Sequence, residues 1–290
     1  MNPTSELSRI VVVGAGTMGH GIAQVAAHSG FKVALVDQDE AALARAKAKI
    51  EENLAGGIQR GKLAESDRER VRANLTTTRD LAAAARDAGL VIEAIFENLA
   101  AKHGVFREVE AAAPPAATLA SNTSSLPIAQ IAAALKRPER LIGMHFFNPV
   151  HLMKLIEIVV HAKTGDAARQ CALDVAKRMG KEPIVVQDSP GFATSRLGVV
   201  LGLEAMRMVE QGVASAADID QAMVLGYNHP MGPLKLTDVV GLDVRLAIAD
   251  TLAKELGGDQ YRAPQLLRDM VERGELGKKS GKGFYDWKQG

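Results

Sequence analysis

Among the seven histidines of this 290-residue chain, His145 has the surroundings best suited to chemistry. It ends the apolar run Leu141–His145, and the next apolar run, Leu155–Val159, carries Glu157 in its middle. A carboxylate is costly to bury unless it is paired, and an imidazole is a natural partner for it. Histidine has an unperturbed pKa of about 6.5, which suits it to exchange protons near neutral pH. The two residues therefore predict either a proton-transfer pair or a structural hydrogen bond.

Glycines near the N-terminus predict a dinucleotide site. The segment Gly14–Gly19 matches G-x-G-x-x-G, follows the apolar run Ile10–Val13 and opens a helical pattern. The first glycine permits a tight turn, the second lets the backbone approach a pyrophosphate, and the third lets helix and strand pack closely. The start of the helix then offers backbone N–H groups to the phosphates. The expected phosphate-binding residues are Gly14, Gly16, Thr17, Met18 and Gly19.

Asp37 predicts which dinucleotide is bound. It closes the apolar run Lys32–Val36, where a strand–helix–strand nucleotide unit places an acidic residue. Its carboxylate would accept hydrogen bonds from ribose hydroxyls and would repel a 2′-phosphate, so the sequence favours NAD over NADP. No second flavin signature accompanies it, which argues against FAD. The alternative is a glycine-rich turn that binds no ligand.

Apolar runs and helical patterns alternate through the first two thirds of the chain. Strands are expected at Ile10–Val13, Lys32–Val36, Leu90–Ala94, Thr118–Ala120, Leu141–His145, Leu155–Val159 and Ile184–Val186. This alternation predicts an α/β fold, in which a Rossmann-type, doubly wound and mainly parallel sheet carries helices on both faces. The polar stretch Ala41–Leu75 is expected to form a protruding pair of helices, broken at Gly56-Gly57, rather than part of the sheet.

After Gln187 the pattern changes to helices separated by glycine and proline. The expected helices are Phe192–Gln211, Ala217–Leu225, Leu242–Leu256 and Pro264–Glu272. We therefore expect residues 1–187 to form the dinucleotide-binding domain and residues 188–290 to form an all-α domain for substrate binding and dimerisation. Apolar residues such as Met206, Met223 and Leu225 are numerous there and favour a homodimer interface.

The composition limits the classes of partner. The 35 Lys+Arg residues against 34 Asp+Glu leave a formal charge of +1, which argues against nucleic acid as the main partner. The single cysteine, Cys171, cannot form a disulfide framework or a Cys-based zinc site, and no spacing of histidines or carboxylates predicts a metal. No apolar run reaches the roughly 20 residues of a membrane-spanning helix, and the polar start of the chain does not read as a signal peptide. We expect a soluble cytoplasmic protein with no membrane partner.

Several longer motifs extend beyond these two sites. They are Ser121–Ser125 (SNTSS), Met144–Pro149 (MHFFNP), Met153–Glu157 (MKLIE), Asn228–Pro233 (NHPMGP) and Gly277–Tyr285 (GKKSGKGFY). Together they resemble the signature of the 3-hydroxyacyl-CoA dehydrogenases, including the 3-hydroxybutyryl-CoA dehydrogenases, from about Ile10 to Trp287. The resemblance implies reversible oxidation of an L-3-hydroxyacyl-CoA, an acyl-CoA thioester, with NAD as the hydride acceptor. The acyl chain length stays open.

The resemblance also implies roles for individual residues. His145 would be the general base in oxidation and the general acid in reduction, and Glu157 would orient it. Ser124 would hydrogen-bond the substrate oxygen or the nicotinamide side. Asn148 would help to hold the cofactor and the His145–Glu157 dyad. Further cofactor contacts are expected from Glu97, Lys102, Asn122 and Lys279, and substrate contacts from Asn53, Arg60 and Ser195.

Three positions in or beside these motifs have alternative interpretations. Ser195 stands where many family members place Asn, and its shorter reach could signal a different acyl preference. Arg60 would attract coenzyme A phosphates, or it would simply belong to a solvated helix face. Ser125 would cap the helix that begins after Pro127.

Two other functions stay open at this point. The first is an NAD-dependent dehydrogenase of a free 3-hydroxy acid or sugar acid on the same fold. The second is a non-catalytic protein that binds NAD.

Overall fold

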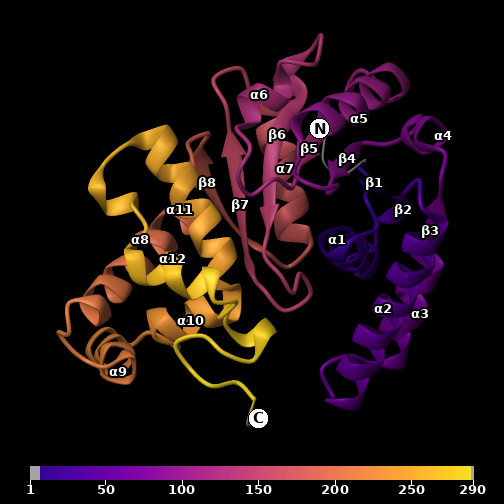
Figure 1. Ribbon diagram of the computed structural model, residues 1–290. Coiled ribbons are helices and arrows are strands. Elements are labelled where there is room, and N and C mark those ends of the chain that lie inside the picture. Colours follow the sequence, from indigo (N-terminus) through magenta and orange to yellow (C-terminus); the bar gives the residue numbers. More distant parts are fainter. Residues whose placement is uncertain (1–6, 289–290) are drawn as a thin grey trace. The chain divides into compact units, whose positions relative to one another are not determined.

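The computed structural model describes residues 7–288. Two compact units divide between Asp188 and Ser189. The first combines a sheet with helices and the second is helical, so the predicted fold class is confirmed (Figure 1). Within the described range, no helix has both the length and the apolar character that crossing a bilayer requires.

The first unit is built on one mainly parallel sheet. Its strands are β1 (Arg9–Val13), β2 (Lys32–Val36), β3 (Leu75–Thr78), β4 (Leu90–Glu93), β5 (Thr118–Ser121), β6 (Leu141–Phe146), β7 (Leu155–Val160) and β8 (Glu182–Gln187). Across the described residues their order is β3-β2-β1-β4-β5-β6-β7-β8, and β6 and β7 form the antiparallel pair among parallel neighbours. The inner strands are buried on both faces, which explains why they read as continuous apolar runs.

Helices cover both faces of this sheet. One face packs against α1 (Thr17–His28) and α7 (Asp166–Arg178). The other packs against α4 (Leu81–Ala85), α5 (Leu99–Ala112) and α6 (Ile128–Ala132). A short 3₁₀ turn, η2 (Pro138–Arg140), leads into β6, and Cys171 packs partly buried against the core. The helices α2 (Glu40–Gln59) and α3 (Glu65–Asn74) lie side by side and form the predicted pair (Figure 1).

Two details of that pair differ from the prediction. The helix α2 continues through Gly56-Gly57 to Gln59, and the turn falls at Arg60-Gly61. Leu63, beyond the turn, packs against Gly57, where a Cβ would lie 2.6 Å from its Cδ1. Strand β3 begins at Leu75, the last residue of the predicted helical stretch, and was not predicted. At the sheet edge Thr76 is exposed and Thr77 and Thr78 are half-buried, so the strand contains no apolar run that its sequence pattern would reveal.

The second unit packs its helices around a separate core. They are α8 (Thr194–Glu210), α9 (Ala216–Tyr227), α10 (Pro233–Val240), α11 (Leu242–Leu256) and α12 (Gln265–Glu272), with the 3₁₀ turns η3 (Asp259–Tyr261) and η4 (Lys278–Ser280). Helix α10 is not among the predicted helices, although Gly232-Pro233 is a typical helix start. Leu203, Met206 and Leu234 are among the buried core residues.

Two buried carboxylates hold the C-terminal segment of this unit. Asp238 accepts hydrogen bonds from the backbone N–H groups of Phe284 and Tyr285 and from the indole N–H of Trp287, all at 2.8–2.9 Å. Asp220 accepts one from the Tyr285 hydroxyl at 2.7 Å. Burial and this carboxylate raise the pKa of Tyr285. The aromatic residues near the C-terminus are therefore part of the helical unit.

Candidate active site

The turn after β1 has the geometry of a pyrophosphate-binding loop. Gly14 has a φ of 103°, and a Cβ there would lie 2.6 Å from the carbonyl oxygen of Ala94. A Cβ on Gly19 would lie 1.7 Å from the Gly14 oxygen, whereas one on Gly16 would meet nothing within 4 Å. Two glycines are thus required by close backbone packing, and the third leaves open space at the start of α1. These residues fit the phosphates of a dinucleotide.

A cavity of about 460 Å³ opens beside this turn. It lies at the carboxyl ends of β1, β2 and β4, where the strand order reverses and open α/β sheets bind ligands. Asp37 lines it, and its carboxylate accepts hydrogen bonds from the Ala15 and Asp39 backbone N–H groups at 2.7 and 2.9 Å. Phe96, which sequence reasoning missed, also lines it and is 72% exposed. The cavity thus offers an acidic group and an aromatic ring to a nucleoside.

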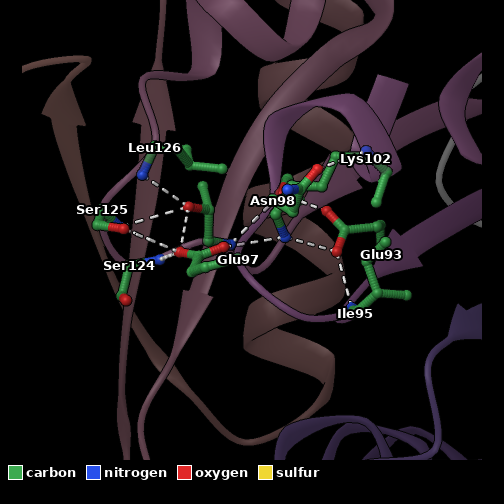
Figure 2. Close-up of polar contacts among 11 residues, drawn as sticks. Glu93, Ile95, Glu97, Asn98, Lys102, Ser124, Ser125 and Leu126 are labelled. Atoms are coloured by element: carbon green, nitrogen blue, oxygen red, sulfur yellow. Dashed lines mark hydrogen bonds and ion pairs between the residues drawn. The ribbon is translucent and has the colours of Figure 1, made fainter. Parts of the chain in front are cut away.

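Figure 2 shows a charged network that joins β4, α5 and the loop after β5. Lys102 is 1% exposed, and its Nζ lies 2.6 Å from Glu93 Oε1 and 3.1 Å from Glu97 Oε2. Glu93 also accepts hydrogen bonds from the Ile95 backbone N–H and the Ser121 hydroxyl. The ammonium group is therefore enclosed between two carboxylates. A direct contact of Lys102 with the ribose stays a prediction, and its burial argues for an indirect role.

Glu97 fixes the loop that carries Ser124. Its Oε1 accepts hydrogen bonds from the Thr123 hydroxyl at 2.6 Å, the Ser124 backbone N–H at 2.9 Å and the Ser125 hydroxyl at 3.2 Å (Figure 2). Burial works to raise the pKa of Glu97. The charge of Lys102 and the hydrogen bonds from Thr123 and Ser124 outweigh it and hold this pKa below its ordinary value. The Ser124 backbone is held by a carboxylate while the residue itself stays exposed.

A distant residue caps the next helix. Asp188 accepts hydrogen bonds from the backbone N–H groups of Ile128 and Ala129, at 2.9 and 2.7 Å. The prediction that Ser125 caps this helix is therefore wrong, because the Ser125 hydroxyl donates to Glu97 instead. Asp188 lies about 60 residues away in sequence, so no local pattern would have revealed it.

His145 and Glu157 form a buried pair across two strands. The antiparallel register of β6 and β7 sets the two residues directly opposite each other. His145 Nδ1 lies 2.7 Å from Glu157 Oε2, and the residues are 7% and 0% exposed. The Asn122 side-chain oxygen accepts a hydrogen bond from the Phe146 backbone N–H and ties the end of β5 to the end of β6. The pairing expected from the sequence is present, at the carboxyl end of β6.

The other predicted residues lie at several places. Asn148 is exposed in the loop after β6, before a cis peptide bond to Pro149. Ser195 is half-buried in the first turn of α8, and Lys279 lies in η4, with its Nζ 2.6 Å from the Asp243 carboxylate. At the start of α1, Thr17 is exposed and Met18 packs partly against the core.

A second cavity, of about 360 Å³, lies between α1, α2 and the loop after β6. Asn53 and Arg60 line it, and Asn53 donates a hydrogen bond to Gln24 at 3.0 Å. Sequence reasoning missed Lys181, whose Nζ donates to the carbonyl oxygens of Val150 and Met153. Burial lowers the pKa of this lysine. The remaining basic residues of the lining are His28, Lys62, His151 and Lys154.

Comparison with known proteins identifies the family. The model of the NAD-binding domain of 3-hydroxyacyl-CoA dehydrogenases matches residues 9–189, and that of their C-terminal domain matches residues 191–287. A probable 3-hydroxybutyryl-CoA dehydrogenase of Bacillus subtilis is 44% identical and is aligned over 98% of this chain and 99% of its own. The mitochondrial hydroxyacyl-coenzyme A dehydrogenase of Homo sapiens is 41% identical, over 97% and 92%.

Solved structures agree with this result. The crystal structure of FadB2 from M. tuberculosis matches with a TM-score of 0.92 and 44% identity, covering 97% of this chain and 99% of that one. The chain therefore belongs to the 3-hydroxyacyl-CoA dehydrogenase family, as its motifs predict. It is an NAD-dependent 3-hydroxyacyl-CoA dehydrogenase.

Proposed function

We propose that the enzyme reversibly oxidises short-chain L-3-hydroxyacyl-CoA thioesters, with 3-hydroxybutyryl-CoA as a substrate, and that His145 and Glu157 manage the proton. The observation that carries this mechanism is the contact of 2.7 Å between His145 Nδ1 and the fully buried Glu157 carboxylate. The names of relatives in Bacillus subtilis and Deinococcus radiodurans, at 44% and 46% identity, support the short acyl chain.

The dyad exchanges one proton with the substrate oxygen. NAD, held at the glycine turn and Asp37, supplies the hydride acceptor when bound. Oxidation of the alcohol also releases a proton, which His145 takes through Nε2 because Glu157 engages Nδ1. In the reverse direction the imidazolium returns this proton to the ketone oxygen. Glu157 keeps the ring oriented and stabilises the imidazolium with its negative charge.

Two neighbouring side chains complete this arrangement. Ser124 donates a hydrogen bond to the substrate oxygen or contacts the nicotinamide side. Its exposure and the hold of Glu97 on its backbone support this role. Asn148 helps to position the cofactor and the dyad from the exposed loop after His145.

The coenzyme A moiety binds in the basic cavity beside α2. Arg60, Lys62 and Lys154 line this cavity and favour phosphate groups, and Asn53 adds an amide. The charge of this lining supports a coenzyme A thioester over a free hydroxy acid. A Lys154→Ala variant is expected to raise KM for the thioester more than it lowers kcat.

The enzyme forms a homodimer through its helical unit. Large apolar side chains are exposed there, among them Leu197, Leu225, Tyr227 and Val244. Exposed apolar area of this kind is typical of subunit interfaces. Sedimentation at micromolar protein should give the mass of a dimer, and a monomeric mass would contradict this part of the proposal. The cytoplasmic location stays a prediction.

A paired assay tests the substrate class. Acetoacetyl-CoA, longer 3-oxoacyl-CoA thioesters and free acetoacetate are each supplied with NADH. The proposal expects the highest kcat/KM for the short thioesters and little turnover of the free acid. Glu157→Gln should lose most turnover while the fold and NADH binding persist. Equal turnover of acetoacetate and acetoacetyl-CoA would refute the assignment.

A further inference from the structure

The first unit contains a buried lysine that the proposed mechanism does not use. Lys181, which directly precedes β8, is 8% exposed, and none of the ion pairs in the described part of the chain involves it. Its Nζ instead donates hydrogen bonds to the carbonyl oxygens of Val150 and Met153, the second at 2.7 Å. The adjacent carboxylate of Glu182 lies 3.8 Å from the Lys154 Nζ. The ammonium group of Lys181 therefore acts on the backbone of one loop.

That loop joins the two strands that carry the dyad. We call residues 147–154 the connecting loop, since β6 ends before it and β7 begins after it. His145 lies in β6 and Glu157 lies opposite it in β7. Within the loop, the backbone N–H of Met153 donates to the carbonyl oxygen of Pro149 at 3.0 Å and closes a turn. The lysine thus binds a turn that lies between the two members of the dyad in sequence.

The connecting loop is attached by one apolar contact and one charged contact. Val150 is 2% exposed and packs against α1, where a Cβ on Gly21 would lie 2.9 Å from the Val150 side chain. Buried carbonyl groups need hydrogen-bond donors, and the ammonium group of Lys181 supplies charge-assisted hydrogen bonds to two of them. Asn148 and Leu152, in the same loop, are exposed. These contacts therefore hold the backbone of a loop whose functional side chain, Asn148, faces solvent.

Stability alone does not account for an ammonium group at this position. Burying a charge without a counter-charge is costly, and the ladder between β6 and β7 pairs these strands without help from Lys181. We propose that Lys181 is a positioning residue for the reaction, because it fixes the connecting loop and thereby holds Asn148 beside the cofactor and the dyad. Asn148 lies two residues before Val150, whose carbonyl oxygen Lys181 binds. The inference rests on the proposed function, which assigns Asn148 to the cofactor and the dyad.

A double-mutant cycle on kcat tests this inference. Lys181→Met retains an unbranched side chain but removes the donors. With saturating NADH and acetoacetyl-CoA, kcat should fall by about tenfold, because a small displacement of a positioning group slows the reaction. In an Asn148→Ala background the same change should lower kcat by less than about threefold, because the residue through which Lys181 acts is gone. Lys181→Arg keeps the donors and the charge and should retain most of the wild-type kcat.

Controls separate the possible failures. Lys177→Met removes an exposed lysine of α7 and should leave kcat unchanged. A wild-type kcat in Lys181→Met would overturn the inference, and so would equal losses in the two backgrounds, because the lysine would then only support the fold. If circular dichroism shows that Lys181→Met is unfolded, Lys181→Gln, which keeps one amide donor group, takes its place in the cycle with the same expected outcomes. His145→Gln and Asn148→Ala, each alone, report on the proposed function, and a wild-type kcat in either would count against that function itself.

Discussion

Two buried polar networks of the first unit differ in what they can do: one joins helix α5 to strand β4, and the other joins strands β6 and β7. Lys102 lies between Glu93 and Glu97, and its ammonium group is enclosed by protein. His145 lies against Glu157 at the carboxyl end of β6, with one ring nitrogen engaged by the carboxylate. Both pairs satisfy the requirement that a buried carboxylate needs a partner.

The difference lies in the chemistry of the cation. The Lys102 ammonium group is enclosed between two carboxylates, so it acts through its position. An imidazole gains and loses a proton near neutral pH, and its second nitrogen can reach a substrate. The lysine network therefore fixes the loop of Ser124, and we propose that the histidine pair exchanges the proton.

The largest effect is expected on turnover. His145→Gln removes the proposed proton carrier, so kcat should fall by about 10²–10⁴-fold. The dissociation constant of NADH should change little, because the glycine turn and Asp37 are untouched. Steady-state kinetics and a fluorescence titration with NADH measure the two quantities. An equal loss of NADH affinity would assign His145 to cofactor binding instead.

Removing the lysine of the charged network should lower the stability of the fold. Lys102→Met leaves Glu93 and Glu97 without their shared counter-charge, so the free energy of unfolding should drop by about 3–5 kcal/mol. Urea denaturation measures this change. The double variant Glu93→Gln with Lys102→Met serves as the control and should recover part of the loss. A drop below about 1 kcal/mol would show that the network contributes no more to stability than an exposed ion pair does.

A smaller effect is expected from Glu97, which is partly exposed to solvent. Because its pKa is lowered in the folded state, its carboxylate contributes stability above its ordinary pKa and loses it as the pH falls through the lowered value. Glu97→Gln should therefore reduce stability at neutral pH, by about 1 kcal/mol after allowance for screening. Denaturation at several pH values should show that the difference in free energy of unfolding between the wild type and Glu97→Gln becomes smaller in acid. A difference that grows in acid would contradict the prediction.

The smallest effect is expected from the Ser124 hydroxyl. Ser124→Ala removes one hydrogen bond to the substrate or cofactor side, so kcat/KM should fall by up to about tenfold. Thermal stability should not change, since Glu97 binds the backbone N–H of this residue and not its side chain. A large loss of stability would give the hydroxyl a structural role.

Sequence patterns predicted the parts of the fold that depend on local periodicity. Fully buried strands such as β1 and β4 read as apolar runs, and their positions were predicted to within a residue or two. The edge strand β3 was missed because its threonines are partly exposed to solvent and form no apolar run. The glycine turn and Asp37 were predictable because one motif contains the physical requirements of the turn.

The site was less predictable where it depends on long-range contacts. A carboxylate in an apolar run indicated a partner for Glu157, but the register that sets it opposite His145 follows from a strand reversal that periodicity does not encode. Lys102 was expected to contact the cofactor because of the family resemblance, and its contact with Glu93, from a helix to a strand, is one that no local pattern indicates. Asp188 and Lys181 act on backbone groups far away in sequence.

The proton exchanged by His145 is the central claim, and the pH dependence of both reaction directions tests it most directly. In the wild type, kcat/KM for reduction of acetoacetyl-CoA should decline as the pH rises, because the imidazolium is the acid. For oxidation of 3-hydroxybutyryl-CoA it should rise over the same interval, because the neutral ring is the base. Both dependences should disappear in His145→Gln. Wild-type pH dependence that persists in that variant would contradict the account.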